Sequence, residues 1–324
     1  MTAPFFSVII PVYNRAAALR TAIASVLAQT CPDFEIVVVD DGSRDDPRAV
    51  VEAFADPRLR FIRQDNAGGG AARNTAIDAA RGRFIAPLDS DDVFLPHHLA
   101  SMRALLEGTS GVVGYARMRV DRGAGRVFLK PPRAIRPGED MASYLLCDRG
   151  FVPTITVVVE REAARRIRYD EDLRTAEDTD FAVRLFLAGH TFRMLEAPSA
   201  VWMDVHNPDR ASAARRCACF GAWLERMRPL IPAHAYHGGR GWAYAKLVAR
   251  DRPLKALALY LNAVLHGCYR PSLAAVVFLQ IFLGRTGYRR LADRAIAWFR
   301  VGLREDALAK AAAKAEAPRR LERA

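Results

Sequence analysis

The sequence lacks the signals that would place it in several large classes of protein. It has neither the Gly-x-Gly-x-x-Gly fingerprint of dinucleotide binders nor the Gly-rich Walker loop, whose glycines let a backbone close around phosphates. Its 324 residues hold five Cys at irregular spacing, which favours a reducing compartment over a disulfide-stapled domain. No apolar run reaches the roughly 18 residues of a spanning helix, and the first residues carry no signal-peptide pattern. We therefore expect a cytoplasmic protein.

The net excess of positive charge lies entirely in the last third of the chain. Residues 211–324 hold 21 Lys and Arg against 7 Asp and Glu, a balance of +14, whereas residues 1–210 hold 27 against 29, a balance of −2. A basic tail on a nearly neutral front favours peripheral contact with an anionic membrane, at the inner face of the plasma membrane, or with an acidic partner. It does not indicate nucleic acid as a partner.

Apolar runs alternate with helical patterns through the front of the chain. Residues 6–12, 35–39 and 84–88 are predicted to be buried strands, and residues 16–29 a helix capped by Asn14. This alternation predicts an α/β fold with a Rossmann-like, mostly parallel central sheet flanked by helices. Further strands are predicted at residues 60–63, 111–119, 126–128, 154–160, 191–196 and 201–205.

Three carboxylates follow the strand at residues 84–88, namely Asp89, Asp91 and Asp92. Like charges this close repel, and a hard divalent cation such as Mg²⁺ or Mn²⁺ offsets the repulsion while bridging to phosphates. The carboxyl end of a strand is also where open α/β sheets bind ligands. The alternative is a solvated Asp-rich turn that caps the next helix.

Two other polar segments also follow predicted strands. Asp40 and Asp41 end the second strand, where a carboxylate accepts hydrogen bonds from a base or ribose, although an Asp-Gly turn alone is the commoner explanation. The Gly-rich segment 66–74 permits close approach to a ligand, with Arg73 placed to meet a phosphate, or it is a plain loop.

Three acids, Glu177, Asp178 and Asp180, open a predicted helix after residue 174. Composition alone explains them by the favourable placement of negative charge at a helix N-terminus, which also favours the ionised form of Asp178. Asp180 is expected to face away from the other two.

Taken together and in this order, these segments resemble the family-2 glycosyltransferases, which have the GT-A fold. The resemblance covers about residues 5–212. Its matching segments are Ser7-Val-Ile-Ile-Pro-Val-Tyr-Asn-Arg15, Val38-Val-Asp-Asp-Gly-Ser43, Asn66 to Asn74, Pro87-Leu-Asp-Ser-Asp-Asp92, Glu177-Asp178 and His206-Asn-Pro-Asp-Arg210.

The resemblance implies a role for each matching residue. Asp178 is implied as the catalytic base, with Glu177 helping to place the acceptor. Asp91 is implied as a ligand of Mn²⁺ or Mg²⁺, with His206 as a further ligand. The residues implied to bind the nucleotide sugar are Pro11, Tyr13, Asp40, Asp41, Arg73, Asp89 and Ser90.

The function implied is inverting transfer of a sugar from a nucleotide-diphosphate donor, expected to be UDP-linked, to a hydroxyl of a saccharide or lipid-linked acceptor. Cell-surface polysaccharide or glycolipid synthesis is the expected setting. The chemistry needs a metal to offset charge on the leaving diphosphate and one carboxylate base, whereas a retaining route needs a carboxylate nucleophile. The alternative is a non-catalytic sugar- or nucleotide-binding protein on the same fold.

The chain is expected to divide into a catalytic domain, residues 1–212, and a helical C-terminal region, residues 213–324. Residues 242–265 carry leucines at helical spacing, which favours helices packed on the catalytic domain. The apolar run 273–283 precedes four arginines, and two interpretations remain: an interfacial helix on anionic lipid or another packed helix. Those arginines are Arg285, Arg289, Arg290 and Arg294.

Overall fold

The computed structural model describes residues 3–123, 126–173, 175–204, 216–283 and 287–288. A five-stranded sheet has the order β3-β2-β1-β4-β8, in which β1 to β4 are parallel and β8 is an antiparallel edge. The mostly parallel α/β sheet predicted from the sequence is therefore confirmed. The strands are β1 (Phe6–Val12), β2 (Phe34–Asp40), β3 (Leu59–Arg63), β4 (Phe84–Pro87) and β8 (Val159–Glu160).

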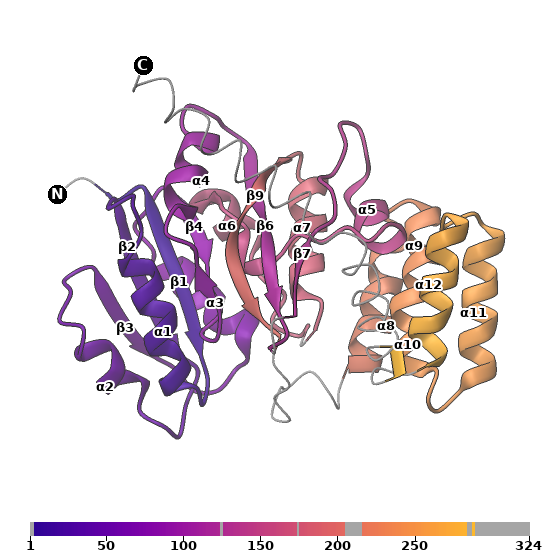
Figure 1. Ribbon diagram of the computed structural model, residues 1–324, viewed down its shortest axis with the longest axis horizontal. Helices are drawn as coiled ribbons and strands as arrows, with labels where there is room; N and C mark the ends of the chain where they lie inside the picture. The colour runs from indigo at the N-terminus through magenta and orange to yellow at the C-terminus, as the bar shows by residue number, and fades with distance from the viewer. Residues whose placement is uncertain (1–2, 124–125, 174, 205–215, 284–286, 289–324) are drawn as a thin grey trace, which may run out of the picture.

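Helices cover both faces of this sheet, which is why its strands are apolar on both sides (Figure 1). Val8 and Ile10 of β1 lie in the same apolar cluster as Leu19 of α1, whereas Ile9 lies with Ala76 of α3 in the other cluster. The helices of this part are α1 (Ala16–Leu27), α2 (Pro47–Glu52), α3 (Gly69–Ala79), α4 (His98–Leu106), α5 (Met141–Cys147), α6 (Arg161–Ile167) and α7 (Glu177–Leu187).

A second, four-stranded sheet has the order β5-β9-β6-β7 and lies beside the first. Its strands are β5 (Val93–Phe94), β6 (Val112–Asp121), β7 (Val127–Lys130) and β9 (Thr191–Met203). The two strands predicted at residues 191–196 and 201–205 are a single strand, because the pairing of β9 with β6 resumes after a bulge.

The strand predicted at residues 154–160 is only half right. Thr154–Thr156 is a short 3₁₀ turn, η1, and only Val159–Glu160 pairs as a strand. The Thr156 hydroxyl accepts a hydrogen bond from the Ala116 amide at 3.2 Å and donates to the Ala116 carbonyl at 3.1 Å. The side chain thus takes the place of a strand backbone beside β6, which no alternation of residue types reveals.

The C-terminal helices form one end of the molecule and share its core (Figure 1). One apolar cluster runs from Ile9 of the sheet through Phe181 of α7 to Trp223 of α8 and Val277 of α12. The helices are α8 (Arg216–Met227), α9 (Ala233–Gly239), the π-helical segment η2 (Arg240–Tyr244), α10 (Ala245–Val248), α11 (Pro253–Leu265) and α12 (Pro271–Phe282). The expected boundary near residue 212 and the four arginines after residue 284 lie outside the described residues.

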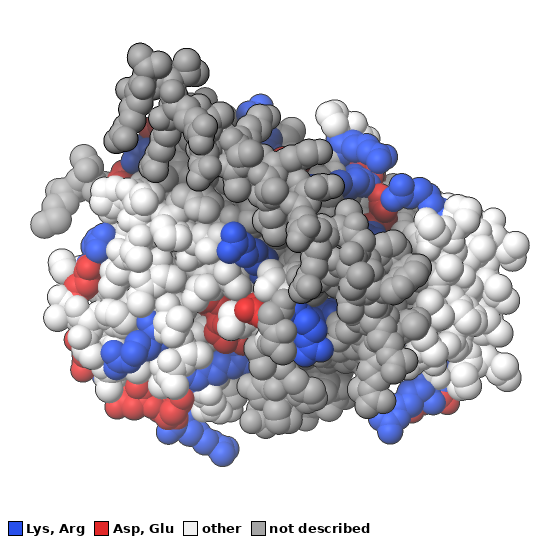
Figure 2. Space-filling model, viewed as in Figure 1, with Lys and Arg blue, Asp and Glu red and all other residues white. Residues whose placement is uncertain are grey.

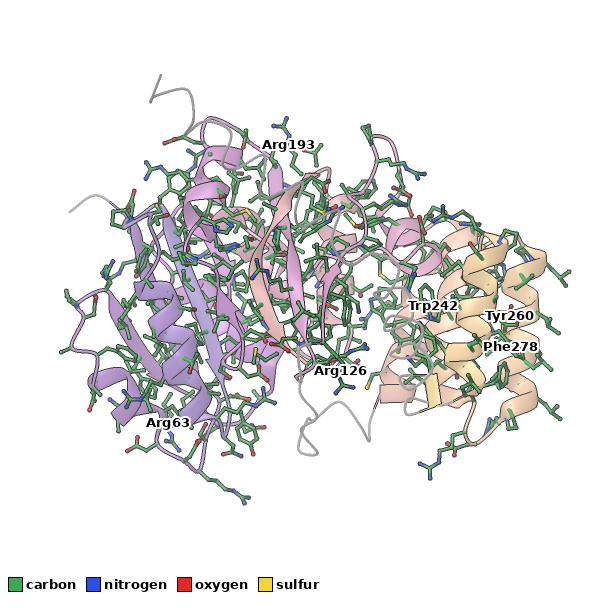
Figure 3. All side chains as sticks on the ribbon, in the orientation of Figure 1. Arg63, Arg126, Arg193, Trp242, Tyr260 and Phe278 are labelled. Carbon is green, nitrogen blue, oxygen red and sulfur yellow. The ribbon has the colours of Figure 1, made fainter. Side chains whose placement is uncertain are left out.

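The apolar run predicted at 273–283 is helix α12, which packs against α11 rather than standing alone. Tyr260 of α11 and Phe278 of α12 lie together with ring centroids 5.6 Å apart (Figure 3). The Trp242 indole N–H donates to the Gln280 side chain at 2.8 Å. Within the described ranges, no helix combines the length and apolar character needed to cross a membrane.

Asp180 connects α7 to the C-terminal helices, because the side chain expected to face away from Glu177 and Asp178 lies toward α8. Its buried carboxylate accepts hydrogen bonds from the Trp223 indole N–H at 2.8 Å and from the Arg184 Nε at 2.8 Å. It is therefore a structural residue, and it cannot serve as a neutral control for Asp178.

We predict that Asp180→Ala lowers the free energy of unfolding by about 2–4 kcal/mol, because it leaves the buried Trp223 N–H and Arg184 guanidinium without their acceptor. Urea denaturation measures the change. Asp172→Ala, at an exposed aspartate nearby, is the matched control and should stay within about 0.5 kcal/mol of the wild type. Equal stabilities of the two variants would show that the link to α8 contributes little.

Candidate active site

The parallel strands bring the polar segments to one edge of the sheet. The register pairs Val12 of β1 with Asp40 of β2, so Tyr13 and Asp41 follow side by side where the strands end. Asp89 follows β4, which pairs with β1 on its other side. Ligands of open α/β sheets bind at this edge, which makes it the candidate active site.

Asp41 uses its carboxylate to hold the loop between β3 and α3. Both oxygens are engaged twice: one by the Gln64 side chain at 2.8 Å and the Ala67 amide at 2.9 Å, the other by the Asn66 side chain at 3.2 Å and the Gly68 amide at 2.8 Å. An ionised carboxylate offers about four acceptor positions. The side chain is buried, and its direct structural task is to order this loop.

Asp40 supports the adjoining turn. Its carboxylate accepts the Ser43 amide at 2.9 Å and lies 3.2 Å from the Arg63 guanidinium. Gly42 has a φ of 76°, and a Cβ there would lie 3.0 Å from the Asn66 amide nitrogen, so the turn needs glycine to pack against the loop. Asp40 and Asp41 thus lie at one turn and fix its shape.

The segment after β1 differs from its prediction, because Asn14 does not cap α1. Asn14 has a φ of 52°, and its side chain accepts the Arg44 amide at 2.8 Å. The residue at the cap position is Arg15, and the Ala16 amide donates instead to Asp45 at 2.7 Å. Pro11 is half-buried, and Tyr13, 45% exposed, stands open at the edge of the site.

A buried arginine on α3 connects the two acidic parts of the site. Arg73 Nη2 donates to Asp89 at 2.7 Å, Nη1 lies 3.5 Å from Glu177, and the guanidinium lies 5.3 Å from the centre of the Tyr169 ring. Burial lowers the pKa of Arg73, but the charges of Asp89 and Glu177 outweigh it, so the pKa is raised overall. Arg73 stays charged and holds both carboxylates in place.

Asp178 lies beside this group at the start of α7. Burial raises its pKa to about 6, and the neighbouring charge of Glu177 raises it too, while the Thr179 amide, donating at 2.7 Å, acts in the opposite direction. The helix N-terminus was expected to favour the ionised form of Asp178. That expectation is wrong, because burial and the charge of Glu177 together raise the pKa of Asp178. The preceding Ala176 has a left-handed φ of 62°, which costs a non-glycine residue free energy.

The metal ligand expected from the sequence, Asp91, forms an ion pair with Arg15 at 2.5 Å. Asp91 and Arg15 are 25% and 29% exposed, so the pair is open to a ligand. Next to it, Ser90 and Asp92 are buried, and the Asp92 carboxylate accepts the Met203 amide at 2.9 Å. The end of β9 therefore fixes the acidic loop, and Arg15 is the cation that faces it.

The donor set at this loop fits a hard divalent cation. Asp91 supplies a partly exposed carboxylate oxygen, and Mg²⁺ and Mn²⁺ are typically held by one or two carboxylates together with substrate phosphates. Such an ion would displace Arg15 from Asp91. His206 lies outside the described residues.

The structure thus gathers Arg73, Asp89, Glu177 and Asp178 around one point, while Asp40 and Asp41 order the adjoining loop. Two further residues of the site were not assigned a role from the sequence. Arg15 lies in a segment that matches the family, but nothing in the sequence indicates that it pairs with Asp91. Tyr169 lies in a segment without a motif. The individual roles of the site residues stay predictions.

The mostly parallel sheet flanked by helices is a GT-A fold. The model of the family described as "Glycosyl transferase family 2" matches residues 7–168, and the chain belongs to that family. The structure is similar to TarS of S. aureus solved in complex with UDP-GlcNAc, with a TM-score of 0.60 and 21% identity over 86% of this chain and 87% of that one.

Two relatives in sequence are named for amylovoran and succinoglycan biosynthesis. The amylovoran biosynthesis glycosyltransferase AmsB of Erwinia amylovora is 27% identical over 69% of this chain and 78% of its own length. The succinoglycan biosynthesis protein ExoO of Rhizobium meliloti is 35% identical over 54% of this chain and 53% of its own length. The chain thus spans about half the length of ExoO.

The raised pKa of Asp178 predicts a pH-dependent cost to stability. A carboxyl group with a folded pKa of about 6 and an ordinary unfolded value near 3.8 stabilises the fold below the unfolded pKa, and loses that contribution as pH rises through the folded pKa. Relative to Asp178→Asn, the wild type should lose about 1–2 kcal/mol between pH 4 and pH 7, discounted for partial exposure. Urea denaturation at a series of pH values measures this, and parallel pH profiles would contradict it.

Proposed function

We propose that this protein is an inverting, metal-dependent glycosyltransferase that moves a sugar from a UDP-linked donor to a hydroxyl of a saccharide or lipid-linked acceptor. The observation that carries the proposal is the position of Arg73, which joins Asp89 of the acidic loop to Glu177, next to Asp178. A donor-binding loop and a candidate base are thereby held at one point. This is the arrangement that a single displacement requires.

Asp178 acts as the general base in this proposal. It accepts the proton of the acceptor hydroxyl while that oxygen attacks the anomeric carbon and the bond to the diphosphate oxygen breaks. A base works best with a pKa near the working pH, and a value raised to about 6 serves this role better than that of an exposed aspartate. Glu177, held by Arg73, helps to position the acceptor.

The donor binds at the edge of the sheet where β1, β2 and β4 end. The open Tyr13 ring and Pro11 contact the nucleoside, and the loop ordered by Asp41 shapes the pocket, supported by Asp40. Asp89 and Ser90 face the ribose and the sugar. The similarity to TarS, which was solved in complex with UDP-GlcNAc, supports a nucleotide-sugar donor and favours UDP.

Asp91, with His206, would hold Mn²⁺ or Mg²⁺ in this proposal. A bound divalent ion supplies Lewis-acid stabilisation of the charge that develops on the departing diphosphate. Arg15, the ion-pair partner of Asp91, would add positive charge at the same place.

The acceptor belongs to the synthesis of a cell-surface polysaccharide or glycolipid. The relatives named for amylovoran and succinoglycan biosynthesis support this setting. We place the reaction in the cytoplasm, at the inner face of the membrane where a lipid-linked acceptor is reached.

The metal part of the proposal predicts that UDP binds at least about tenfold more tightly with Mn²⁺ or Mg²⁺ than with EDTA, because an ion held by Asp91 would offset the charge of the diphosphate. Asp91→Ala should abolish the difference without changing the melting temperature by more than a few degrees. Isothermal titration of both proteins measures the affinities. Equal UDP affinity with metal and with EDTA in the wild type would rule out the metal.

The base assignment predicts that Asp178→Asn lowers transfer about 10²-fold or more, because the amide cannot accept the hydroxyl proton. UDP affinity should barely change, since the donor is assigned to other residues. Transfer is measured as UDP release with a saccharide acceptor, alongside UDP titration of the same variant.

Asp172→Asn is the matched control, as an exposed aspartate just before α7, and should keep full activity. Near wild-type transfer by Asp178→Asn would remove Asp178 from the role of base. A wild type that binds UDP-sugars but transfers none, with either class of acceptor, would favour the non-catalytic alternative.

A further inference from the structure

Helix α11 carries an apolar stripe on the side that faces away from the protein. Leu254, Leu261 and Leu265 are 81%, 47% and 86% exposed. Their spacing, completed by the exposed Ala258, places them along one side of the helix. The buried residues of α11 are Ala256, Tyr260 and Ala263, on the opposite side. Both long faces of this helix are therefore apolar, although only one is covered by the protein.

A further apolar side chain is exposed on the neighbouring helix. Phe278 of α12 is 41% exposed and packs on Tyr260, on the side of α11 opposite the stripe (Figure 3). Figure 2 shows this end of the molecule almost without charged side chains, while Lys and Arg gather at its margins. Exposed leucines that stand singly are normal, but a contiguous apolar surface marks a site of interaction.

The margin at the start of α11 is basic. Arg250, Arg252 and Lys255 are all exposed there, with Asp251 as the one acid among them. Long basic side chains that flank an apolar stripe are the pattern of a helix lying in a membrane interface, because their stems follow the apolar surface and their heads reach lipid phosphates. A second copy of this chain that met the first through the same stripe would offer these basic side chains few acids, because residues 253–265 contain none and Asp251 is the one acid just before them. Charge complementarity thus favours an anionic bilayer over a second copy.

We infer that the outer face of α11, made of Leu254, Ala258, Leu261 and Leu265, docks on an anionic membrane surface. The sequence favoured packing for residues 242–265 and left open whether residues 273–283 form an interfacial or a packed helix. The structure adds a candidate surface on α11, because this helix buries one face, with Ala256, Tyr260 and Ala263, and exposes the leucines on the other. The inference gives a partner to the proposed function, and it holds or fails independently of sugar transfer.

The test is flotation of the full chain with vesicles of phosphatidylcholine that contain or lack phosphatidylglycerol. We expect binding to the anionic vesicles, weakened when the ionic strength is raised from about 0.1 to 0.5 M. Leu254→Gln/Leu265→Gln should lower the fraction bound about tenfold or more, because it removes apolar area from the interface. Its UDP affinity and melting temperature should match those of the wild type.

The matched control is Leu187→Gln/Leu230→Gln, which changes two leucines that are 43% and 56% exposed elsewhere on the surface. It should bind vesicles within about twofold of the wild type. The inference is overturned if the wild type ignores anionic vesicles, if the α11 variant binds as well as the control, or if sedimentation shows that the α11 variant only converts a dimer to a monomer. UDP binding and sugar transfer are measured on the same α11 variant. If both persist, a failure of the membrane inference is distinguished from a failure of the proposed function.

Discussion

The active site depends on one buried arginine. Arg73 reaches Asp89 from one side and Glu177 from the other, and its guanidinium lies over the ring of Tyr169. Neither Asp89 nor Glu177 has to be fully buried, because each carboxylate meets the Arg73 guanidinium where it approaches the protein surface. A buried charge is costly without partners, so the arginine and the two acids hold one another in place. Four segments far apart in the chain, around residues 73, 89, 169 and 177, thereby meet.

The helical C-terminal region is part of this arrangement and not an appendage to it. Trp223 of α8 donates to Asp180, which lies two residues after Asp178 on the same helix. The apolar cluster that surrounds Trp223 is continuous with the one beneath α3 and the sheet. The position of α7, and with it that of Asp178, is therefore set from two sides: by Arg73 through Glu177, and by α8 through Asp180.

The sequence predicts the strands and the edge of the site well because their signals are local. Buried strands such as residues 6–12 are continuous apolar runs, and carboxylates that follow such runs must meet at one edge of a parallel sheet. The sequence fails where a partner is distant. The Thr156 side chain pairs with the Ala116 backbone as a neighbouring strand would, and Asp180 accepts a hydrogen bond from Trp223. The Asp41 carboxylate accepts hydrogen bonds from loop amides. Residue type and spacing do not indicate these pairings. In the same way, the leucine spacing of α11 does not indicate which face of the helix is left exposed.

Ala176 gives the site a further property. This alanine holds a left-handed backbone just before Glu177 and Asp178, where glycine would be relaxed. Glycine would relieve about 1 kcal/mol of strain, but it would also widen the range of directions from which α7 can start. A fixed start keeps Asp178, the base in our proposal, aimed at one point, so the chain gives up some stability for a narrow approach angle. A search for heat-resistant variants that relaxed this turn would meet that trade-off, because relaxing the turn loosens the group that it orients.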